Sequence, residues 1–549
     1  MTAAPPAAPW VPTDADLRAY ALDSGVCVRP LVRRVVDRET GAAEVVALRC
    51  GSTREYVCPS CAARSRRLRA QQCAEGWHLA DDPIRHETAA DDDREDDDSG
   101  PADDEQSAGD LASRRVRSTR RRDDAADLPR VPVEDRSVGR TFTGRDGREY
   151  RPSMFVTLTL PSYGRVDRDT ATPVDPASYD YPRAARDAVA LSALVDRWVQ
   201  NLRRCAGYRV QYFAVIEAQR RLAGHVHLAI RGAIPRTVLR QVTKATYASL
   251  WWPQTDHVVY DEDDRLPVWD PGTGRYVHPI TRVPLTSWSQ ALDDLDEDPA
   301  AQPWHVARFG AQVDVKGIIA PSVEADRAVA YLVKYLTKAI AHTHTDTDPQ
   351  TGRPVDIDAS RTAHVDRLAE ELRYTPCSPR CANWLRYGVQ PQGAGPGLVP
   401  GRCPGAAHDR ENAGLGGRRV LVSRHWSGKT LHEHAADRAA VVRQALAAAG
   451  IDAPQTDRKA ADVLDDDGAP RYRWEPVEPG ETDYRAAVLH LARERRRWRA
   501  EYDHARRLLE AASPTGVPPP PGCGRPFGNP PDHTPTTDRH DHREQETAA

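Results

Sequence analysis

Two apolar stretches separated by only five residues constrain this chain more than any other feature. YRVQYFAVIEAQ (208–219) and HVHLAIRG (225–232) are rich in β-branched and aromatic residues, and both read as strands. Strands joined by so short a turn pair as an antiparallel hairpin. That pairing would bring Glu217 beside His225 and His227, whose side chains leave their strand on the same face.

Two neutral imidazoles and a carboxylate with open positions suit Mg²⁺ or Mn²⁺ acting on phosphate oxygens. The alternative is that Glu217 pairs with an arginine and that hydrogen bonds satisfy His225 and His227. These residues alone leave both interpretations open.

The flanking segments predict an α+β domain with a central antiparallel sheet and helices around it. MFVTLTL (154–160) reads as a further strand, and its Thr157 and Thr159 receive no assigned role. Apolar residues at helical spacing predict an amphipathic helix over 186–204. The Asp- and Pro-rich stretch 253–305 reads as an insertion.

The stretch RAVAYLVKYLTKAI (327–340) lacks Gly and Pro and predicts a helix. Tyr331 and Tyr335 lie one turn apart on one face, and Lys334 and Lys338 form the neighbouring row. The ordinary interpretation is an amphipathic helix with tyrosines at the core edge. The alternative is a pair of nucleophiles, because lysines and a divalent metal would stabilise a phenolate.

The cysteines are grouped rather than dispersed, which favours metal over disulfides. Cys58 and Cys61 form a tight knuckle, and with Cys27 and Cys50 they would make a four-cysteine zinc site. Cys73 is an alternative to Cys27 as the fourth ligand of this site.

A second group combines three thiols and an imidazole, namely Cys377, Cys381, Cys403 and His408. It predicts another structural zinc site, which would fold a segment that has little apolar core of its own.

Composition divides the chain into six regions. They are a cysteine-rich, ribbon-like region (14–80), a disordered charged linker (81–135), the main domain (140–345), a cysteine–histidine element with a basic segment (370–440), a helical region (441–512) and a disordered proline-rich tail (513–549).

The charge is unevenly distributed along the chain. Residues 81–110 hold fourteen acidic and two basic residues, so the rest of a chain of net charge −4 is net +8. A basic body is compatible with a polyanionic ligand. The N-terminus lacks the pattern of a signal peptide and no stretch has the length of a membrane span, so we expect a cytoplasmic protein.

FVTLTLPS, then Glu217 with HVH, then AYLVKYLTK, in that order, resemble the three motifs of rolling-circle replication initiators in the HUH endonuclease superfamily. The resemblance is closest to initiators of actinobacterial plasmids and integrative elements. It implies an HUH-type domain over 140–345 that nicks one strand of origin DNA, forms a 5′-phosphotyrosine link, leaves a 3′-hydroxyl primer and later rejoins the strand.

The resemblance also implies residue roles. His225, His227 and Glu217 match the positions of the metal ligands. Tyr335 matches the nucleophile and Tyr331 the second tyrosine, although both fit the motif. Lys334 and Lys338 match lysines that contact phosphate or the metal site.

The implied partners are single-stranded origin DNA, a host helicase and a host DNA polymerase. Two other functions remain open at this point. One is a conjugative mobilisation relaxase, although the histidine pair before the tyrosine favours the initiator. The other is a non-catalytic, zinc-bearing DNA-binding regulator.

Overall fold

The computed structural model describes most of the folded chain. It covers residues 13–77, 79, 122–137, 141–261, 265–320, 322–334, 336, 359–416, 419–448, 450, 464, 468–477 and 483–512. The chain divides into two compact units, Met1–Arg438 with Ala460–Arg493, and Ala439–Lys459 with Glu494–Ala549. The sites described below lie in the first unit. The linker up to residue 121, the tail after residue 512, Tyr335 and Lys338 lie outside the described residues.

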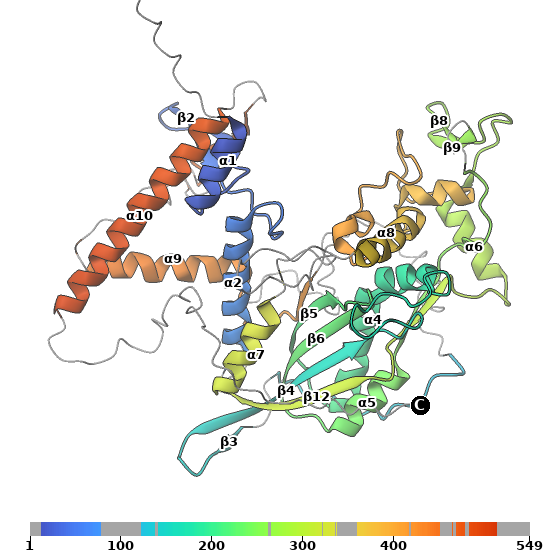
Figure 1. The fold of residues 1–549 in the computed structure, drawn as a ribbon, viewed down its shortest axis with the longest axis horizontal. Coiled ribbons are helices and arrows are strands. Elements are labelled where there is room, and N and C mark those ends of the chain that lie inside the picture. The colour runs from blue at the N-terminus through green and yellow to red at the C-terminus, as the bar shows by residue number, and fades with distance from the viewer. Residues whose placement is uncertain are drawn as a thin grey trace, which may run out of the picture. The chain divides into compact units, whose positions relative to one another are not determined.

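A six-stranded antiparallel sheet lies at the centre of the first unit (Figure 1). Its main strands follow the order β12 (Val313–Ala320), β4 (Glu149–Thr159), β6 (Gly224–Arg231), β5 (Tyr212–Ala218) and β14 (Val420–Val422), and β3 (Phe142–Thr143) pairs with β4. The predicted hairpin is therefore present as β5 and β6. The edge strand β14 comes from a distant part of the chain, which no local pattern indicated.

One face of the sheet is covered by α4 (Tyr181–Ala206), α5 (Arg236–Ala245) and α8 (Ala359–Tyr374). α4 buries the apolar stripe that predicted it, including Leu191, Leu194 and Trp198. The Nε1 of Trp198 donates a hydrogen bond of 2.9 Å to Thr243 Oγ1 of α5. This bond joins the two helices, and it satisfies a polar atom of a fully buried ring.

The other face is covered by α2 (Pro59–Trp77) and α7 (Val323–Lys334), which pack against each other (Figure 1). Trp77 at the end of α2 is buried, and its Nε1 donates to Ser153 Oγ of β4 over 2.6 Å. Gly76 allows the Trp426 ring to lie close, since a Cβ there would come within 2.2 Å of ring atoms. The end of α2 is thus fixed on the sheet.

A smaller subdomain is formed by residues near the N-terminal and C-terminal ends of the first unit. It contains α1 (Asp14–Asp23), which contributes Ala21 to its core, and a three-stranded sheet of β15 (Tyr472–Pro476), β1 (Leu31–Asp37) and β2 (Ala43–Leu48). The start of α10 (Tyr484–Ala512) adds Val488 and Ala492 to its core, and Tyr484 donates from its hydroxyl to the Val28 carbonyl over 2.9 Å.

The stretch 253–305, predicted as an insertion, contains local structure between β7 (Tyr247–Leu250) and its antiparallel partner β11 (His305–Arg308). It holds β8 (Val268–Asp270), β9 (Arg275–Val277), β10 (Thr286–Ser287) and α6 (Trp288–Glu297). β10 pairs in parallel with β13 (Val389–Gln390), which connects the insertion to the segment that carries the second cysteine group.

Residues 122–137 fall in the range that composition assigned to the linker. Their backbone bonds the end of α4, with Val131 N donating to Arg204 O and Glu134 N to Gly207 O, both over 2.9 Å. α9 (Leu431–Ala448) spans the boundary of the two units. Among the described residues, every helix is too short or too polar to cross a bilayer.

Candidate active site

The sheet register places the acidic and imidazole side chains together. Glu217 of β5 lies opposite His225 of β6, which in turn lies opposite Thr159 of β4. His227 lies opposite Thr157 in the same way. Because alternate residues of a strand share a face, all five side chains leave the sheet on the face covered by α2 and α7.

The two threonines orient the two histidines. Thr157 Oγ1 lies 3.0 Å from Nδ1 of His227, and Thr159 Oγ1 lies 2.8 Å from Nδ1 of His225. When each Nδ1–H donates to its threonine, each Nε2 carries the lone pair through which a neutral imidazole binds a cation. Sequence reasoning had left these threonines without a role. The sequence signal that could have indicated this role is the spacing of Thr157 and Thr159. They lie two residues apart, as His225 and His227 do, on the neighbouring strand.

Glu217 is a buried carboxylate, 5% exposed, that lacks a full set of partners. Its Oε2 lies 3.8 Å from His227 Nε2, and its Oε1 is buried without a hydrogen bond. Burial raises the pKa of this carboxyl to about 7, against the opposing effect of Arg419 and Lys334. An unsatisfied carboxylate oxygen beside two imidazoles is a donor set that fits a hard divalent cation.

His227 is suited to act as a neutral ligand. Burial, and then the neighbouring His225, lower the pKa of His227 to about 3, so its ring is uncharged at neutral pH. Among the described residues, three groups have ligand atoms that all lie within 4.8 Å of one another. The ligand atoms of Glu217, His225 and His227 are spaced more widely than this.

Tyr331 approaches this group from α7. Its Oη lies 3.5 Å from His227 Nε2, and its ring meets the His227 ring edge-on with centroids 5.1 Å apart. Tyr331 is also 43% exposed, so solvent reaches part of this residue. Lys334, one turn further, is close enough to lower the pKa of Glu217.

The first cysteine group is assembled as the spacing predicted. The sulfur atoms of Cys27, Cys50, Cys58 and Cys61 all lie within 4.8 Å of one another. Contact with Cys27, and then burial, raise the pKa of Cys61 to about 12, which disfavours a thiolate unless a cation is present. Cys73 lies elsewhere, in the core between α2 and the sheet.

The second group, Cys377, Cys381, Cys403 and His408, has its ligand atoms within the same limit. His408 lies at the end of a short helical turn, η4 (Ala406–His408), and its Nδ1 lies 2.7 Å from the Leu372 carbonyl of α8. Donation from this Nδ1–H leaves Nε2 free to face the thiols, with Cys381 Sγ 3.4 Å away. Each cysteine group therefore could hold a metal ion, and four ligands of this kind suit zinc.

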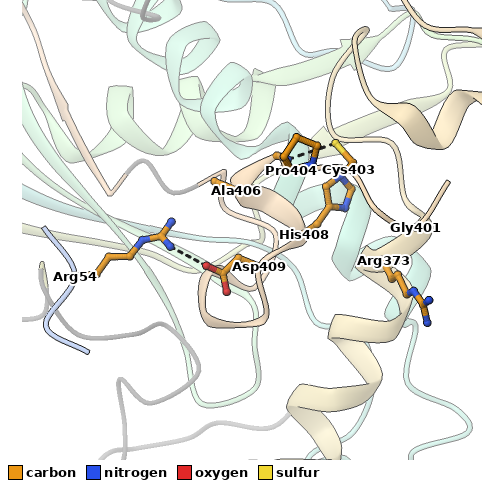
Figure 2. Close-up of a pocket in the computed structure, with 9 residues that line it drawn as sticks. Arg54, Arg373, Gly401, Cys403, Pro404, Ala406, His408 and Asp409 are labelled. Atoms are coloured by element: carbon orange, nitrogen blue, oxygen red, sulfur yellow. Dashed lines mark hydrogen bonds and ion pairs between the residues drawn. The ribbon is translucent and has the colours of Figure 1, made fainter. Parts of the chain in front are cut away.

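An ion pair connects the neighbourhoods of the two cysteine groups. Arg54, between Cys50 and Cys58 in the sequence, lies 2.7 Å from Asp409, the residue after His408 (Figure 2). A cavity of about 360 Å³ lies beside this pair, lined also by Arg373 and the 401–408 segment. Both partners of the pair are 35% exposed, so it contributes at most about 1 kcal/mol.

Glu75, His434 and Asp437 form a further close group, between α2 and α9. The positive charge beside these carboxylates comes from the protein itself rather than from a metal ion. Lys429 Nζ lies 2.8 Å from Asp437 and 4.0 Å from Glu75. His434 is buried between Glu75 Oε2, 3.1 Å from its Nδ1, and Ser427 Oγ, 3.0 Å from its Nε2. This group reads as a polar contact between helices.

These features define a class of protein: an α+β protein with a candidate metal site on an antiparallel sheet, a tyrosine helix above it and two cysteine groups. Over residues 14–495 the chain matches the sequence model of a family described as RepSA: Replication initiator protein, pSAM2. The chain belongs to this family of replication initiators. No curated protein and no solved structure matches it.

Proposed function

We propose that this replication initiator nicks one strand of origin DNA by tyrosine attack at the Glu217, His225 and His227 site. The observation that carries the proposal is the position of Tyr331 Oη, 3.5 Å from Nε2 of His227, on a residue that is 43% exposed. A phosphodiester bound at this group would therefore meet a phenol. Family membership favours an initiator over a mobilisation relaxase.

The attacking phenol oxygen forms a bond to phosphorus, and the bond from phosphorus to the 3′ oxygen breaks. The phenol proton leaves to water, since Tyr331 is partly exposed, and the 3′ oxygen takes up a proton. The products are a 5′-phosphotyrosine and a free 3′-hydroxyl. The link conserves the phosphodiester, so attack by the 3′-hydroxyl in the reverse direction rejoins the strand.

A bound Mg²⁺ or Mn²⁺ would neutralise charge on the scissile phosphate and stabilise the phenolate. Glu217 and the Nε2 atoms of His225 and His227 would hold it, with Thr157 and Thr159 fixing the two rings. Lys334 adds a positive charge next to the site and is placed to contact the phosphate.

Two tyrosines one turn apart would serve the two transfer steps of a replication round. The family resemblance assigns Tyr335 as the first nucleophile, although both tyrosines fit the motif. That assignment remains a prediction because Tyr335 lies outside the described residues, as does Lys338. Zinc in the two cysteine groups would stabilise their local folds. A host helicase and polymerase would then unwind the duplex and extend the 3′-hydroxyl.

The test is a labelled single-stranded origin oligonucleotide incubated with the full chain and Mn²⁺ or Mg²⁺. We expect a covalent adduct that survives denaturation and is lost in the Tyr331→Phe, Tyr335→Phe double variant. The single variants identify which tyrosine attacks first, and Tyr502→Phe on α10 is the matched control.

An adduct that persists in the double variant contradicts the tyrosine mechanism. Origin binding that needs neither tyrosine nor divalent metal, with no adduct in the unaltered protein, indicates a non-catalytic zinc-bearing regulator instead.

A further inference from the structure

Helix α2 joins the first cysteine group to the tyrosine helix. Its first turn carries Cys61 of that group, and its other half packs against α7 and the sheet. At 19 residues, and about 1.5 Å per residue, α2 is about 28 Å long. Its C-terminal part lies on the sheet face that carries the candidate nicking site, and its N-terminal part leads to the first cysteine group (Figure 1).

The half of α2 next to the cysteine group is arginine-rich, and two of its arginines are exposed. The sequence there is ARSRRLRA (63–70), and burial resumes at Ala70. Arg64 and Arg67 are exposed and, being three residues apart, project on the same side of the helix. Arg66 is half-buried beside them.

More positive charge converges on the same place from other segments. Arg49 precedes Cys50, whose thiol lies within 4.8 Å of the Cys61 thiol at the start of α2. Desolvation by neighbouring atoms, and then the charges of Arg49 and of Arg438 on α9, lower the pKa of Arg64, although the residue as a whole is exposed. Neither Arg64 nor Arg67 forms an ion pair with any residue in the described ranges.

Like charges gathered from three segments repel one another, and a bound polyanion would relieve this repulsion. α10 shows the contrast. There Arg497 lies 3.2 Å from Glu494, and Arg499 lies 3.9 Å from Asp503, so a similar arginine run is balanced by its own helix.

We infer that the α2 arginine row binds the phosphate backbone of duplex DNA beside the nicking site. The inference rests on the proposed function, because it gives α2 the role of holding the duplex next to the strand that is cut. Duplex DNA fits better than a single strand, since single-strand sites add aromatic stacking platforms and residues 63–70 include no aromatic side chain.

The experiment compares the full-length double variant Arg64→Ala, Arg67→Ala with the matched double variant Arg497→Ala, Arg499→Ala. The probes are a fluorescein-labelled random-sequence duplex and one of its single strands, because backbone contacts do not depend on sequence. Fluorescence anisotropy over a range of salt concentrations gives Kd and its salt dependence, with divalent metal omitted to prevent cleavage.

We expect the α2 variant to weaken duplex binding and to reduce the slope of log Kd against log salt by about 0.9 for each lost phosphate contact, or about 1.8 in total. The α10 variant should leave both unchanged. Thermal melting and zinc content check the fold; if the double variant loses zinc, Arg67→Ala alone, more than one turn beyond Cys61, replaces it.

Duplex binding with the unaltered slope in a folded α2 variant overturns the inference. So does a loss confined to the single strand. Adduct formation on the short single-stranded oligonucleotide is measured in parallel. Its absence in the unaltered protein would contradict the nicking proposal without affecting the binding result.

Discussion

The carboxylate–histidine site and the first cysteine group both gather metal-binding side chains, but different forces hold them. Glu217, His225 and His227 lie on paired central strands whose neighbours are fully buried, so backbone hydrogen bonds and core packing position them. The cysteines lie on loops and one helix end, next to a small core of residues such as Ala21, Val26 and Val488.

This difference in supporting structure indicates which of the two sites would depend on a metal for its fold. A sheet of this size positions its side chains before any ion binds, so a metal there would serve chemistry rather than folding. A small core buries too little apolar area to order its own loops, so a metal there would serve folding. The four predictions below test this contrast.

The largest effect should follow the loss of zinc from the first cysteine group. Structural zinc contributes a binding free energy of about 10 kcal/mol or more, which becomes folding free energy. Cys61→Ser should therefore abolish one bound zinc and make residues 13–77 sensitive to protease, as zinc analysis and limited proteolysis would show. Resistance equal to that of the unaltered protein would contradict a structural role, and Cys205→Ser is the control.

His227→Ala should have a different effect from Cys61→Ser. It should greatly lower the nicking activity and change the stability of the fold little. Losing a ligand of a catalytic metal removes several kcal/mol of transition-state stabilisation, equivalent to at least about 10²-fold in rate. Adduct formation measures the rate and thermal melting measures the fold. A collapse of stability like that expected for Cys61→Ser would show that the two sites do not differ in kind.

The carboxyl of Glu217 should make the metal-free protein lose stability as pH rises. Its pKa in the folded protein is raised to about 7 from an ordinary value of 4.5, so unfolding releases a proton between these values and is favoured by higher pH. The penalty is absent below about pH 4.5, complete above about pH 7, and on the order of 3 kcal/mol.

Thermal melting across this range, for the protein and for Glu217→Gln, isolates the carboxyl. The variant should lack this part of the pH dependence, and Mn²⁺ should remove it from the unaltered protein by binding the carboxylate. Identical pH profiles for the two metal-free proteins would count against the buried, unsatisfied state of Glu217.

The smallest effect should come from Thr157→Val, which removes the hydrogen bond to Nδ1 of His227 but keeps the shape of the side chain. Losing a partner that orients a metal ligand lowers metal affinity by about 10- to 100-fold. Calorimetric titration with Mn²⁺ should show this loss, and Thr157→Ser should restore the affinity. Equal affinity in the Val variant would mean that strand packing alone orients the ring.

Much of both sites could be predicted from sequence because their constraints are local. The short turn predicts that Glu217 lies beside the two histidines, and the register places it opposite His225, with the hairpin closing at Ala218 and Gly224. The spacing of Cys58 and Cys61, and of Cys377 and Cys381, likewise predicted groups whose ligand atoms the structure brings together. In each case a short segment of chain limits the geometry.

Contacts between distant segments were decided by the tertiary structure alone. The sequence could not show that β14 completes the sheet, that Thr157 and Thr159 meet the two imidazoles, or that Cys73 lies in the core while Cys27 joins the first cysteine group. It also could not place α2 beside α7. These pairings depend on which apolar faces bury one another, and that choice is made by the whole core rather than by any one segment.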